Sequence, residues 1–464
     1  MKYIYLALLI FLHPIFGNTT TNDSSKLNKT SVTEIIRIQP GTMAEQLRKV
    51  LLKAASLKTS VTLKGSQHTQ GGHTFIKNGI LLDFQDCKHI KQISDSVIRI
   101  QCGATWKDVL DYLQPKGLSV HIMQSNFDFS VGGTLSTNVH GWQLNTPPLV
   151  ESIQGFHLLL ADGSIVYCTR NLFPDLFAAT IGGYGLLGVV LDIDLRVIPN
   201  KMYELNYWVT EIPSFVPIFQ DILTNPKAHM FFGRFNLDHD NFLKQLSITT
   251  YNETNKKIST KPLKESAALK KITSWIFKKT YNNNFFRKMR WKLENAKLTR
   301  MFVNHLPRNQ LLYHSANHYL SDEPNTVDLL QEYFIPTENF EKFVDVLQNM
   351  QNELEPHLMN ITLRQVNKDH QTLLNYTSTD RLCFVMFFRG PNTKIFDKQI
   401  EKVSQELTDH ALTLNGTYYL PYRPYQTKEQ FQKAYPSYQE FKKLKIKYDP
   451  KLIFKNQFYE NYFQ

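Results

Sequence analysis

Residues 182–190 read GGYGLLGVV and contain Gly183, Gly185 and Gly188. This G-x-G-x-x-G spacing is the fingerprint of a dinucleotide-binding turn, which needs a strand before the glycines and a helix after them. The residues that follow, VVLDIDLRVIP (189–199), alternate with the period of a strand and end at a proline. The helix whose N-terminus would bind a pyrophosphate is therefore missing, and the sequence argues against a nicotinamide dehydrogenase.

Two more glycine-rich stretches precede this one in the chain. KGSQHTQGGH (64–73) follows a strand-like run, and SVGGTLSTNVHG (130–141) combines glycines with Ser, Thr, Asn and His. Backbone N–H groups that glycine leaves accessible, together with small hydroxyls, form concave sites that suit phosphate. Three such loops favour one long anionic cofactor bound along its length. The alternative is three ordinary turns in a β-rich domain.

The segments around these loops alternate between helical and strand-like patterns of apolar residues. Thr105 and Gly117 are expected to begin and end one of the helices. The predicted elements are helices over 41–58, 105–117 and 173–183, strands over 79–84 and 95–104, and a hairpin with an Asp-Gly turn over 152–168. The sequence therefore predicts an α+β fold.

The length of the chain and its N-terminal residues limit the class of protein to which it can belong. The chain has 464 residues, 42% of them hydrophobic, which suffices for one large or two medium cores. Residues 1–17 carry one Lys before an apolar run that is too short to span a bilayer. We interpret them as a secretory signal peptide, with an uncleaved anchor as the alternative. Residues 18–30, rich in Asn, Ser and Thr, are expected to be a flexible leader, and the mature protein to be exported to the periplasm, the extracellular space or a membrane surface.

The four cysteines carry no metal-binding pattern. Cys87, Cys102, Cys168 and Cys383 include no C-x-x-C pair, so no metal site is predicted. Export would permit a disulfide, and the alternative is that the four are buried small hydrophobes.

The net charge of +12 is concentrated in one stretch. Between residues 255 and 300 there are fourteen Lys or Arg and only two acids, interleaved with aromatic and aliphatic side chains. Such a stretch predicts contact with an anionic membrane surface. The alternative is a solvated helical insertion with a buried stripe. Nucleic acid is not expected as a partner, because no recognisable binding module is present.

The run from Leu63 through Pro199 resembles the flavin-binding domain of the vanillyl-alcohol oxidase/p-cresol methylhydroxylase (PCMH) superfamily. Its first loop is similar to the R-G-x-G-H-S loop that holds the FAD pyrophosphate. VGGTLSTNVHG resembles a stretch of aldonolactone oxidases and decaprenylphosphoryl-ribose oxidase, and LFAATIGGYGLLGVVLDIDLRVIP resembles the segment that ends that domain. Residues 435–463 are similar to the C-terminal run of sugar and sugar-lactone oxidases, with QEYFIP (331–336) and RLCFVMFFR (381–389) in support.

The resemblance implies a site for FAD. His68 stands where many relatives attach the flavin through a histidine. The alternative is a histidine that packs or hydrogen bonds against FAD without a covalent link. The residues implied to contact FAD are Lys64, Gly65, Ser66, Gln67, His68, Thr69, Gly132, Gly133, Thr134, Thr137, Asn138, His140, Gly141, Gly183, Gly185, Gly188, Val190 and Asn456.

The resemblance also implies that catalytic side chains come from a C-terminal strand, NGTYYLPYRPY (415–425). Tyr419 matches the tyrosine of a Y-L-x-K segment in the decaprenylphosphoryl-ribose enzyme, and Tyr422 stands at that enzyme's lysine. A tyrosine base would need a cation such as Arg423 to lower its pKa. Arg364 is expected to hold an acidic or polyol substrate. Further candidates are Arg389, Gln331, Glu332 and Tyr333, and for all of these the alternative is a residue that only packs or faces solvent.

These inferences combine into one expected function. The resemblance implies an FAD-dependent oxidoreductase in which hydride passes from a CH–OH group of a sugar, polyol, lactone or lipid-linked sugar to flavin N5. The electron acceptor is expected to be O₂ or a membrane electron carrier. The flavin domain would comprise 31–200 and the returning segment 416–464, with a substrate-cap domain of antiparallel sheet and helices over 201–415. The alternative is a flavin-binding envelope protein without turnover.

Overall fold

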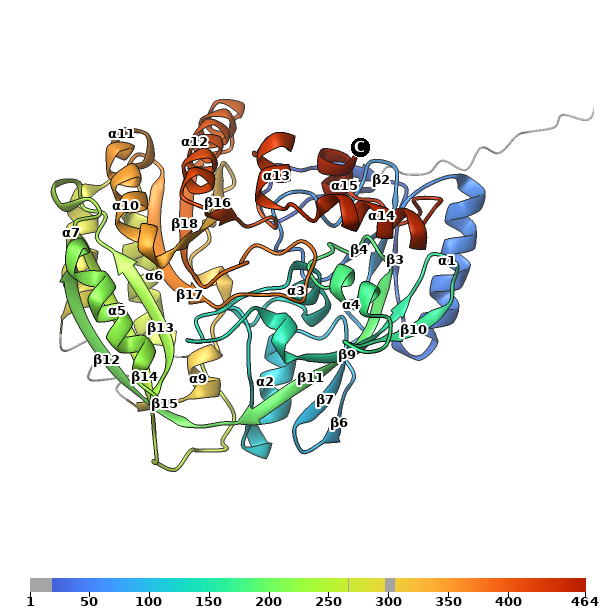
Figure 1. The fold of residues 1–464 in the computed structure, drawn as a ribbon, viewed down its shortest axis with the longest axis horizontal. Coiled ribbons are helices and arrows are strands. Elements are labelled where there is room, and N and C mark those ends of the chain that lie inside the picture. Colours follow the sequence, from blue (N-terminus) through green and yellow to red (C-terminus); the bar gives the residue numbers. More distant parts are fainter. Residues whose placement is uncertain (1–18, 266, 297–304) are drawn as a thin grey trace, which may run out of the picture.

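The computed structural model describes residues 19–265, 267–296 and 305–464. The signal peptide predicted for residues 1–17 therefore lies outside the described residues. Within the described part of the chain, no helix has the length and apolar character that a membrane crossing requires. Figure 1 shows the large sheet, whose strands lie from residue 202 onward, on one side and the smaller sheets of the preceding residues on the other.

The first of the smaller sheets is parallel and follows a short hairpin. The hairpin pairs β1 (Thr19–Thr21) with β2 (Thr30–Val32). The strand order of the parallel sheet is β3-β5-β4, with α1 in the connection between β3 and β4. The elements are β3 (Glu34–Arg37), α1 (Met43–Leu57), β4 (Val61–Lys64) and β5 (Ile80–Asp83). α1 buries the side chains of Met43, Leu47, Val50, Leu51 and Ala54, which confirms the predicted amphipathic helix.

The second sheet is antiparallel, in the order β10-β9-β11-β7-β6, with β8 also paired to β11. Thr105 caps α2 through a capping box with Asp108, as its position predicts. The Asp-Gly hairpin, the strand after Gly188 and the short helix α4 are also present. The elements are β6 (Ile90–Ser94), β7 (Val97–Gln101), α2 (Trp106–Leu113), β8 (Leu118–Val120), β9 (Ile153–Leu159), β10 (Ile165–Cys168), α4 (Pro174–Thr180) and β11 (Val189–Pro199).

The third sheet is antiparallel and has eight strands, in the order β15-β12-β14-β13-β17-β18-β16-β19. Its strands are β12 (Met202–Glu211), β13 (Ala228–Phe235), β14 (Gln245–Thr254), β15 (His305–Pro307), β16 (Thr326–Pro336), β17 (Leu358–Val366), β18 (Arg381–Pro391) and β19 (Thr417–Tyr418). Helices α10 and α12 pack on β16. The helices of this half are α5 (Phe215–Thr224), α6 (Ala267–Lys279), α7 (Asn284–Asn295), α9 (Arg308–Leu312), α10 (Phe340–Asn349), α11 (Gln351–Leu354) and α12 (Lys394–Thr413).

The C-terminal segment packs against the first half of the chain. It forms α13 (Lys428–Ala434), α14 (Tyr438–Tyr448) and α15 (Gln457–Phe463). The N–H of Val61 in β4 donates to the carbonyl of Ile453 at 2.7 Å. The ammonium of Lys445, fully buried, donates to the carbonyl of Leu186 at 2.7 Å, to the carbonyl of Phe454 and to Asp449. The Lys445 side chain thus joins the C-terminal segment to the third glycine-rich stretch.

Three local predictions are wrong. Residues 18–30 were expected to be a flexible leader, yet the described residues from 19 onward form the β1–β2 hairpin. Asp23 accepts from the N–H of Gly72 at 3.0 Å, and Ser24 donates to the carbonyl of His68 at 3.0 Å. The middle of the second glycine-rich stretch is not a loop but the short helix α3 (Val131–Thr137). Most of 415–425 is irregular, because β19 contains only two residues.

The cysteines are buried and free, and no disulfide joins them. The basic stretch forms two helices, α6 and α7. Ile276 and Phe277 are buried, while Trp275 and Phe285 are 54% and 69% exposed. The insertion therefore has both a buried stripe and an exposed apolar face.

Substitution of Lys445 tests how the C-terminal segment is held. In Lys445→Met the carboxylate of Asp449 stays buried without its cation, so we expect the free energy of unfolding to fall by about 3–5 kcal/mol. Lys443→Met, at an exposed lysine of the same helix, is the matched control and should leave it unchanged. Urea denaturation measures both, and equal stability of the two variants would contradict this role of the pair.

Candidate functional site

One cavity of about 520 Å³ brings the three glycine-rich stretches together, although they lie far apart in the sequence. Its volume is in the range of ligand pockets, about 300–1,000 Å³. Of the residues that the resemblance assigns to FAD, the cavity is lined by Lys64, Gly65, Ser66, Gln67, His68, Thr69, Gly132, Gly133, Thr134, Thr137, His140, Gly185, Gly188 and Val190.

The stretches are held to one another by hydrogen bonds that backbone N–H groups donate. The N–H of Ser66 donates to Ser130 Oγ at 3.3 Å, which joins the first stretch to the second. The N–H of Tyr184 donates to the carbonyl of Ser136 at 3.0 Å, which joins the third stretch to α3. Chain segments with few side chains can converge in this way because their N–H groups find acceptors on the neighbouring stretches.

Four residues assigned to FAD do not line the cavity, and each has a structural role instead. Asn138 ends α3 in a left-handed conformation and donates to Asp369 at 3.1 Å. Gly141 lies against the carbonyl of Met123, and Gly183 lies against that of Ala179, where a Cβ would collide. Asn456 donates from its side-chain amide to the carbonyls of His73 at 2.8 Å and of Tyr184 at 2.9 Å. Asn456 therefore bridges the first and third stretches.

The glycine at 188 is required by backbone geometry. Its φ is +153°, which side-chain-bearing residues rarely adopt, and a Cβ there would collide with the carbonyl oxygen of Leu159. Gly132 is similarly confined, because a Cβ would lie 2.8 Å from Cys102 Cβ. Both positions let the backbone itself form the cavity wall.

The first stretch keeps a glycine-like shape where it departs from the family motif. Gln67, which occupies the motif's central glycine, has a left-handed φ of 55°. Lys64, at the motif's arginine, forms an ion pair with Asp83 at 3.2 Å. His68 stacks on Phe129 with ring centroids 4.0 Å apart, and burial lowers the pKa of His68. Covalent attachment through His68 stays a prediction.

The cavity has the donors and acceptors that a nucleotide cofactor would use. Several buried polar atoms on its wall have no partner among the described residues, which is rare unless a ligand supplies one. They are Thr69 Oγ1, Thr74 Oγ1, Thr180 Oγ1 and both ring nitrogens of His73. Hydroxyls, a histidine and glycine backbone fit the phosphates and ribityl hydroxyls of FAD, so the residues present fit this cofactor.

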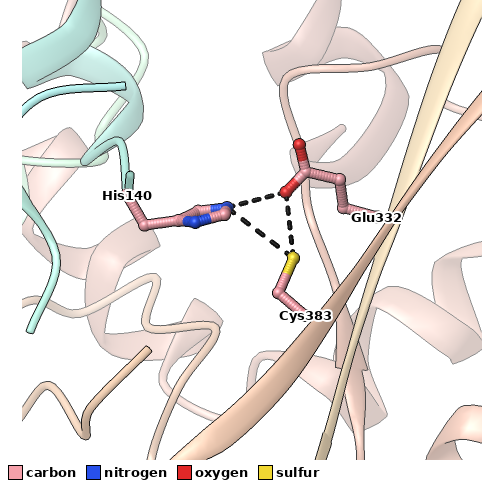
Figure 2. A group of neighbouring side chains, drawn as sticks. All are labelled: His140, Glu332 and Cys383. Carbon is pink, nitrogen blue, oxygen red and sulfur yellow. Dashed lines mark hydrogen bonds and ion pairs between the residues drawn. The ribbon is translucent and has the colours of Figure 1, made fainter. Parts of the chain in front are cut away.

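A buried cluster of ionisable side chains lies on the wall of the same cavity. His140 Nε2 is 2.7 Å from Glu332 Oε2, and Figure 2 shows the Cys383 thiol beside both. Cys383 Sγ donates to Glu332 Oε2 at 3.2 Å, and the Tyr422 hydroxyl donates to Glu332 Oε1. The His140 and Glu332 side chains are only 3% and 4% exposed. Since β16 and β18 are paired strands, the register of the sheet fixes Glu332 and Cys383 relative to each other.

The partners of Glu332 determine its charge. Burial alone would raise the pKa of Glu332, but attraction and hydrogen bonding from His140, the charge of Arg364 and the Tyr422 hydroxyl outweigh it and lower the pKa to about 2. The carboxylate is therefore ionised at neutral pH. Because His140 Nε2 faces Glu332 while Nδ1 is buried without a partner among the described residues, Nδ1 is the nitrogen left to accept a proton.

His140, Glu332 and Cys383 could also ligate a metal, since one donor atom from each lies within 4.8 Å of the others. Their hydrogen bonds argue against a metal site. Glu332 Oε2 already accepts from both neighbours, and burial together with Glu332 raises the pKa of the Cys383 thiol, which disfavours the thiolate that metals bind. The cluster is better suited to hold and move a proton.

The tyrosines predicted as catalytic bases line the cavity but act as donors. Tyr419 donates to the carbonyl of Thr137 at 2.9 Å, and Tyr422 donates to Glu332. Burial and the charge of Glu332 raise the pKa of both hydroxyls well above its usual value. Arg423 does not line the cavity, because it donates to Asn28 at 2.6 Å and to Asp397 at 3.2 Å. A tyrosine base activated by Arg423 is therefore not supported by the geometry.

Other predicted substrate residues divide between the cavity and the core. Arg364 lines the cavity and donates to Ser125 Oγ at 2.9 Å. Arg389 is buried in an ion pair with Asp328 at 2.7 Å, and Gln331 and Tyr333 are buried outside the cavity lining. The sequence names Glu332 only as one candidate among several. It could have been singled out because it is a carboxylate within an apolar strand, which is uncommon without a partner.

Comparisons with known proteins agree with this geometry. Residues 35–169 match the FAD binding domain model, and residues 194–462 match the D-arabinono-1,4-lactone oxidase model. The chain is 21% identical to L-gulonolactone oxidase of Mus musculus over 92% of this chain and 94% of that protein. It is 28% identical to cytokinin dehydrogenase 2 of Arabidopsis thaliana and 27% identical to a putative D-arabinono-1,4-lactone oxidase of Neurospora crassa, over 35% and 37% of this chain.

The last two matches span only about a third of the relatives' lengths, 33% and 30%. They cover a similarly small share of this chain, whereas the second family model covers more than half of it. With its FAD-binding domain preceding a sheet-containing second domain, the chain belongs to the D-arabinono-1,4-lactone oxidase family.

Proposed function

We propose that this protein is an FAD-dependent oxidoreductase that oxidises a CH–OH group of a sugar, sugar lactone or polyol. The observation that carries the proposal is that one cavity joins the three glycine-rich stretches to the buried His140–Glu332 pair. The lactone oxidases among its relatives support a carbohydrate substrate and O₂ as the acceptor. When bound, FAD supplies the hydride acceptor that no side chain can provide.

The protein's own residues would manage the proton of the substrate hydroxyl. His140 lines the cavity, and its Nδ1 has no partner among the described residues, while Glu332 on Nε2 holds the ring and stabilises its positive charge, as a carboxylate does for a catalytic histidine. Tyr422 satisfies the second carboxylate oxygen. Arg364 and Thr362, neighbours on β17, offer donors to substrate oxygens in the same cavity. The burial of His140 and Glu332 keeps bulk water from the pair.

The exposed face of the α6–α7 insertion supports a second proposal, contact with an anionic membrane surface. Ile272 and Trp275 are one turn apart on α6, Phe285 and Leu293 are two turns apart on α7, and all four are 41–69% exposed. The insertion is also strongly basic. An exported protein placed in this way would reach a lipid-linked sugar or a membrane electron carrier.

Replacement of Glu332 tests the proposed chemistry. In Glu332→Gln the ring of His140 loses its charged partner, so we expect kcat/KM to fall about 100-fold or more while FAD content is unchanged. His157→Gln is the matched control, since His157 forms a pair with Asp192 at the same 2.7 Å but outside the cavity. Anaerobic reduction of the flavin by sugar lactones and by sugar acids measures both, and a loss of less than about threefold in Glu332→Gln would reject the assignment.

The same pair predicts a pH dependence. Because the pKa of Glu332 is depressed to about 2 in the folded protein, the stability that its ionisation contributes is present above the ordinary glutamate pKa of about 4.3 and is lost as pH falls toward 2. Glu332 therefore stays ionised at about pH 4.3, the ordinary pKa of a glutamate. Its protonation should not cause kcat/KM to fall near that pH, which the pH profile of kcat/KM measures.

Vesicle co-sedimentation tests the membrane proposal. The protein should sediment with vesicles that contain phosphatidylserine and stay in solution with phosphatidylcholine alone. Trp275→Ser/Phe285→Ser should reduce the bound fraction by about half or more. Ile395→Ser, which removes an apolar side chain that is 74% exposed on α12, is the control. Equal binding of all three proteins would contradict this proposal.

A further inference from the structure

The end of the cavity beneath the large sheet is lined by arginines and aromatic rings. Arg234 on β13, Arg290 on α7 and Arg364 on β17 contribute guanidinium groups, and α6 contributes Phe277. Arg290 lies over the ring of Phe277 with its guanidinium carbon 4.8 Å from the centroid. The basic insertion therefore provides part of the cavity wall and not only an external face.

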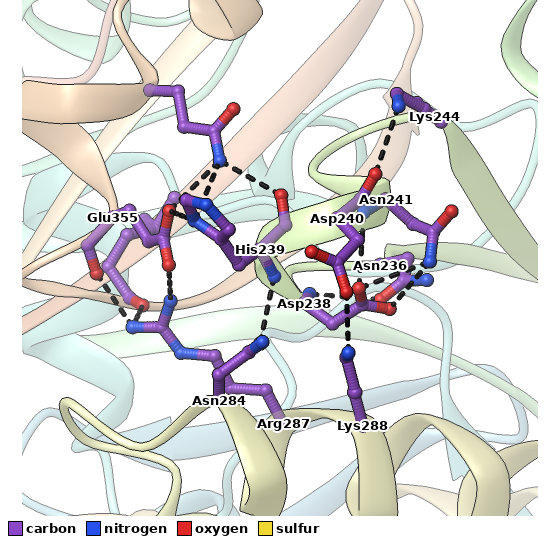
Figure 3. Close-up of polar contacts among 12 residues, drawn as sticks. Asn236, Asp238, His239, Asp240, Asn241, Lys244, Asn284, Arg287, Lys288 and Glu355 are labelled. Carbon is purple, nitrogen blue, oxygen red and sulfur yellow. Dashed lines mark hydrogen bonds and ion pairs between the residues drawn. The ribbon is translucent and has the colours of Figure 1, made fainter.

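Helix α7 is held in place by a network of polar contacts, which Figure 3 shows. The N–H of His239 donates to Asn284 Oδ1 at 2.8 Å, and Arg287 forms an ion pair with Glu355 at 3.2 Å. Lys288 forms a further ion pair with Asp240. These contacts join the first two turns of α7 to the turn between β13 and β14 and to the end of α11, so the position of Arg290, which follows directly, is fixed.

Positive charge exceeds negative charge at this end of the cavity. Glu332 is the one acidic residue among the described residues of the lining, and His140, Cys383 and Tyr422 already use its oxygens. Glu294, which is not among the residues that line the cavity, accepts from Arg234 at 2.8 Å and from Arg290 at 2.7 Å. One carboxylate is thus shared by two guanidinium groups.

Several donors at this end have no acceptor. Arg234 Nε and Trp142 Nε1 are buried without a partner among the described residues, although both residues line the cavity. Arg364 donates within the described part of the chain only to Ser125. The donors of Arg290, in contrast, are used by Glu294, Met359 and Asn360. Arg290 is therefore a positioning residue, whereas Arg234 and Arg364 have donors to offer.

We propose that this end of the cavity binds an oxyanion of the substrate, so that the substrate is a sugar acid or a sugar phosphate rather than a neutral sugar. Buried donors without acceptors are costly, and a carboxylate or phosphate supplies several acceptor atoms and the missing negative charge together. Planar guanidinium groups are the side chains best matched to such anions. This inference rests on the proposed function and names the substrate class for it.

Ligand-induced thermal stabilisation of the holoenzyme tests this inference without turnover. D-glucuronate, glucose 6-phosphate and glucose are the probes. We expect one or both anionic sugars to bind about 10- to 100-fold tighter than glucose. Preference for glucuronate would assign a carboxylate and preference for the phosphate a phosphoryl group. Equal stabilisation by all three sugars would overturn the inference.

Variants test whether Arg234 causes the preference for anionic sugars. Arg234→Gln should abolish the preference for the anionic sugar, and Arg234→Lys, which keeps the charge, should restore part of it. Lys292→Gln removes one exposed charge from the same helix α7 and should leave the preference unchanged. An unchanged preference in Arg234→Gln would overturn the assignment. Bleaching of the flavin in the same samples reports the proposed function separately, so anion binding without bleaching would reject that function and retain the site.

Discussion

A buried amide joins two of the three glycine-rich stretches to the C-terminal helices. The side chain of Asn456 donates to the carbonyls of His73 and Tyr184, which lie on two of the three glycine-rich stretches, and its oxygen accepts from the N–H of Tyr459 at the start of α15. Glycine-rich backbone has little side-chain area with which to pack, so its position depends on hydrogen bonds from neighbours. The C-terminal helices thus determine where the first and third stretches lie, and the cavity follows from that.

The other constraint is electrostatic. A carboxylate as deeply buried as Glu332 must be paired, because desolvation of an isolated charge costs far more than a fold can supply. Three side chains satisfy it, and they come from three separate parts of the chain: His140 after α3, Cys383 on β18 and Tyr422 in the irregular segment after β19. The requirement for charge pairing therefore joins the FAD-binding domain to the large sheet, at the place where the proposed chemistry needs a proton acceptor.

Local patterns in the sequence predicted much of the first half of the chain. The alternation after Gly188 correctly predicted β11, Thr105 correctly predicted the start of α2, and the three glycine-rich stretches do line one cavity. The roles of Asn456 and of the His140–Glu332 pair could not be predicted in this way, because each depends on contacts between residues hundreds of positions apart. The direction of Arg423 likewise depends on Asp397, a partner on α12 that no local pattern indicates.

If separated stretches of backbone converge to hold one flavin nucleotide, each chain should bind one FAD. The most direct test is the stoichiometry of FAD in the purified protein, from the visible absorbance of released flavin against protein concentration. We expect one FAD per chain, regained after removal when FAD is added back. A colourless protein that does not take up added FAD would contradict it.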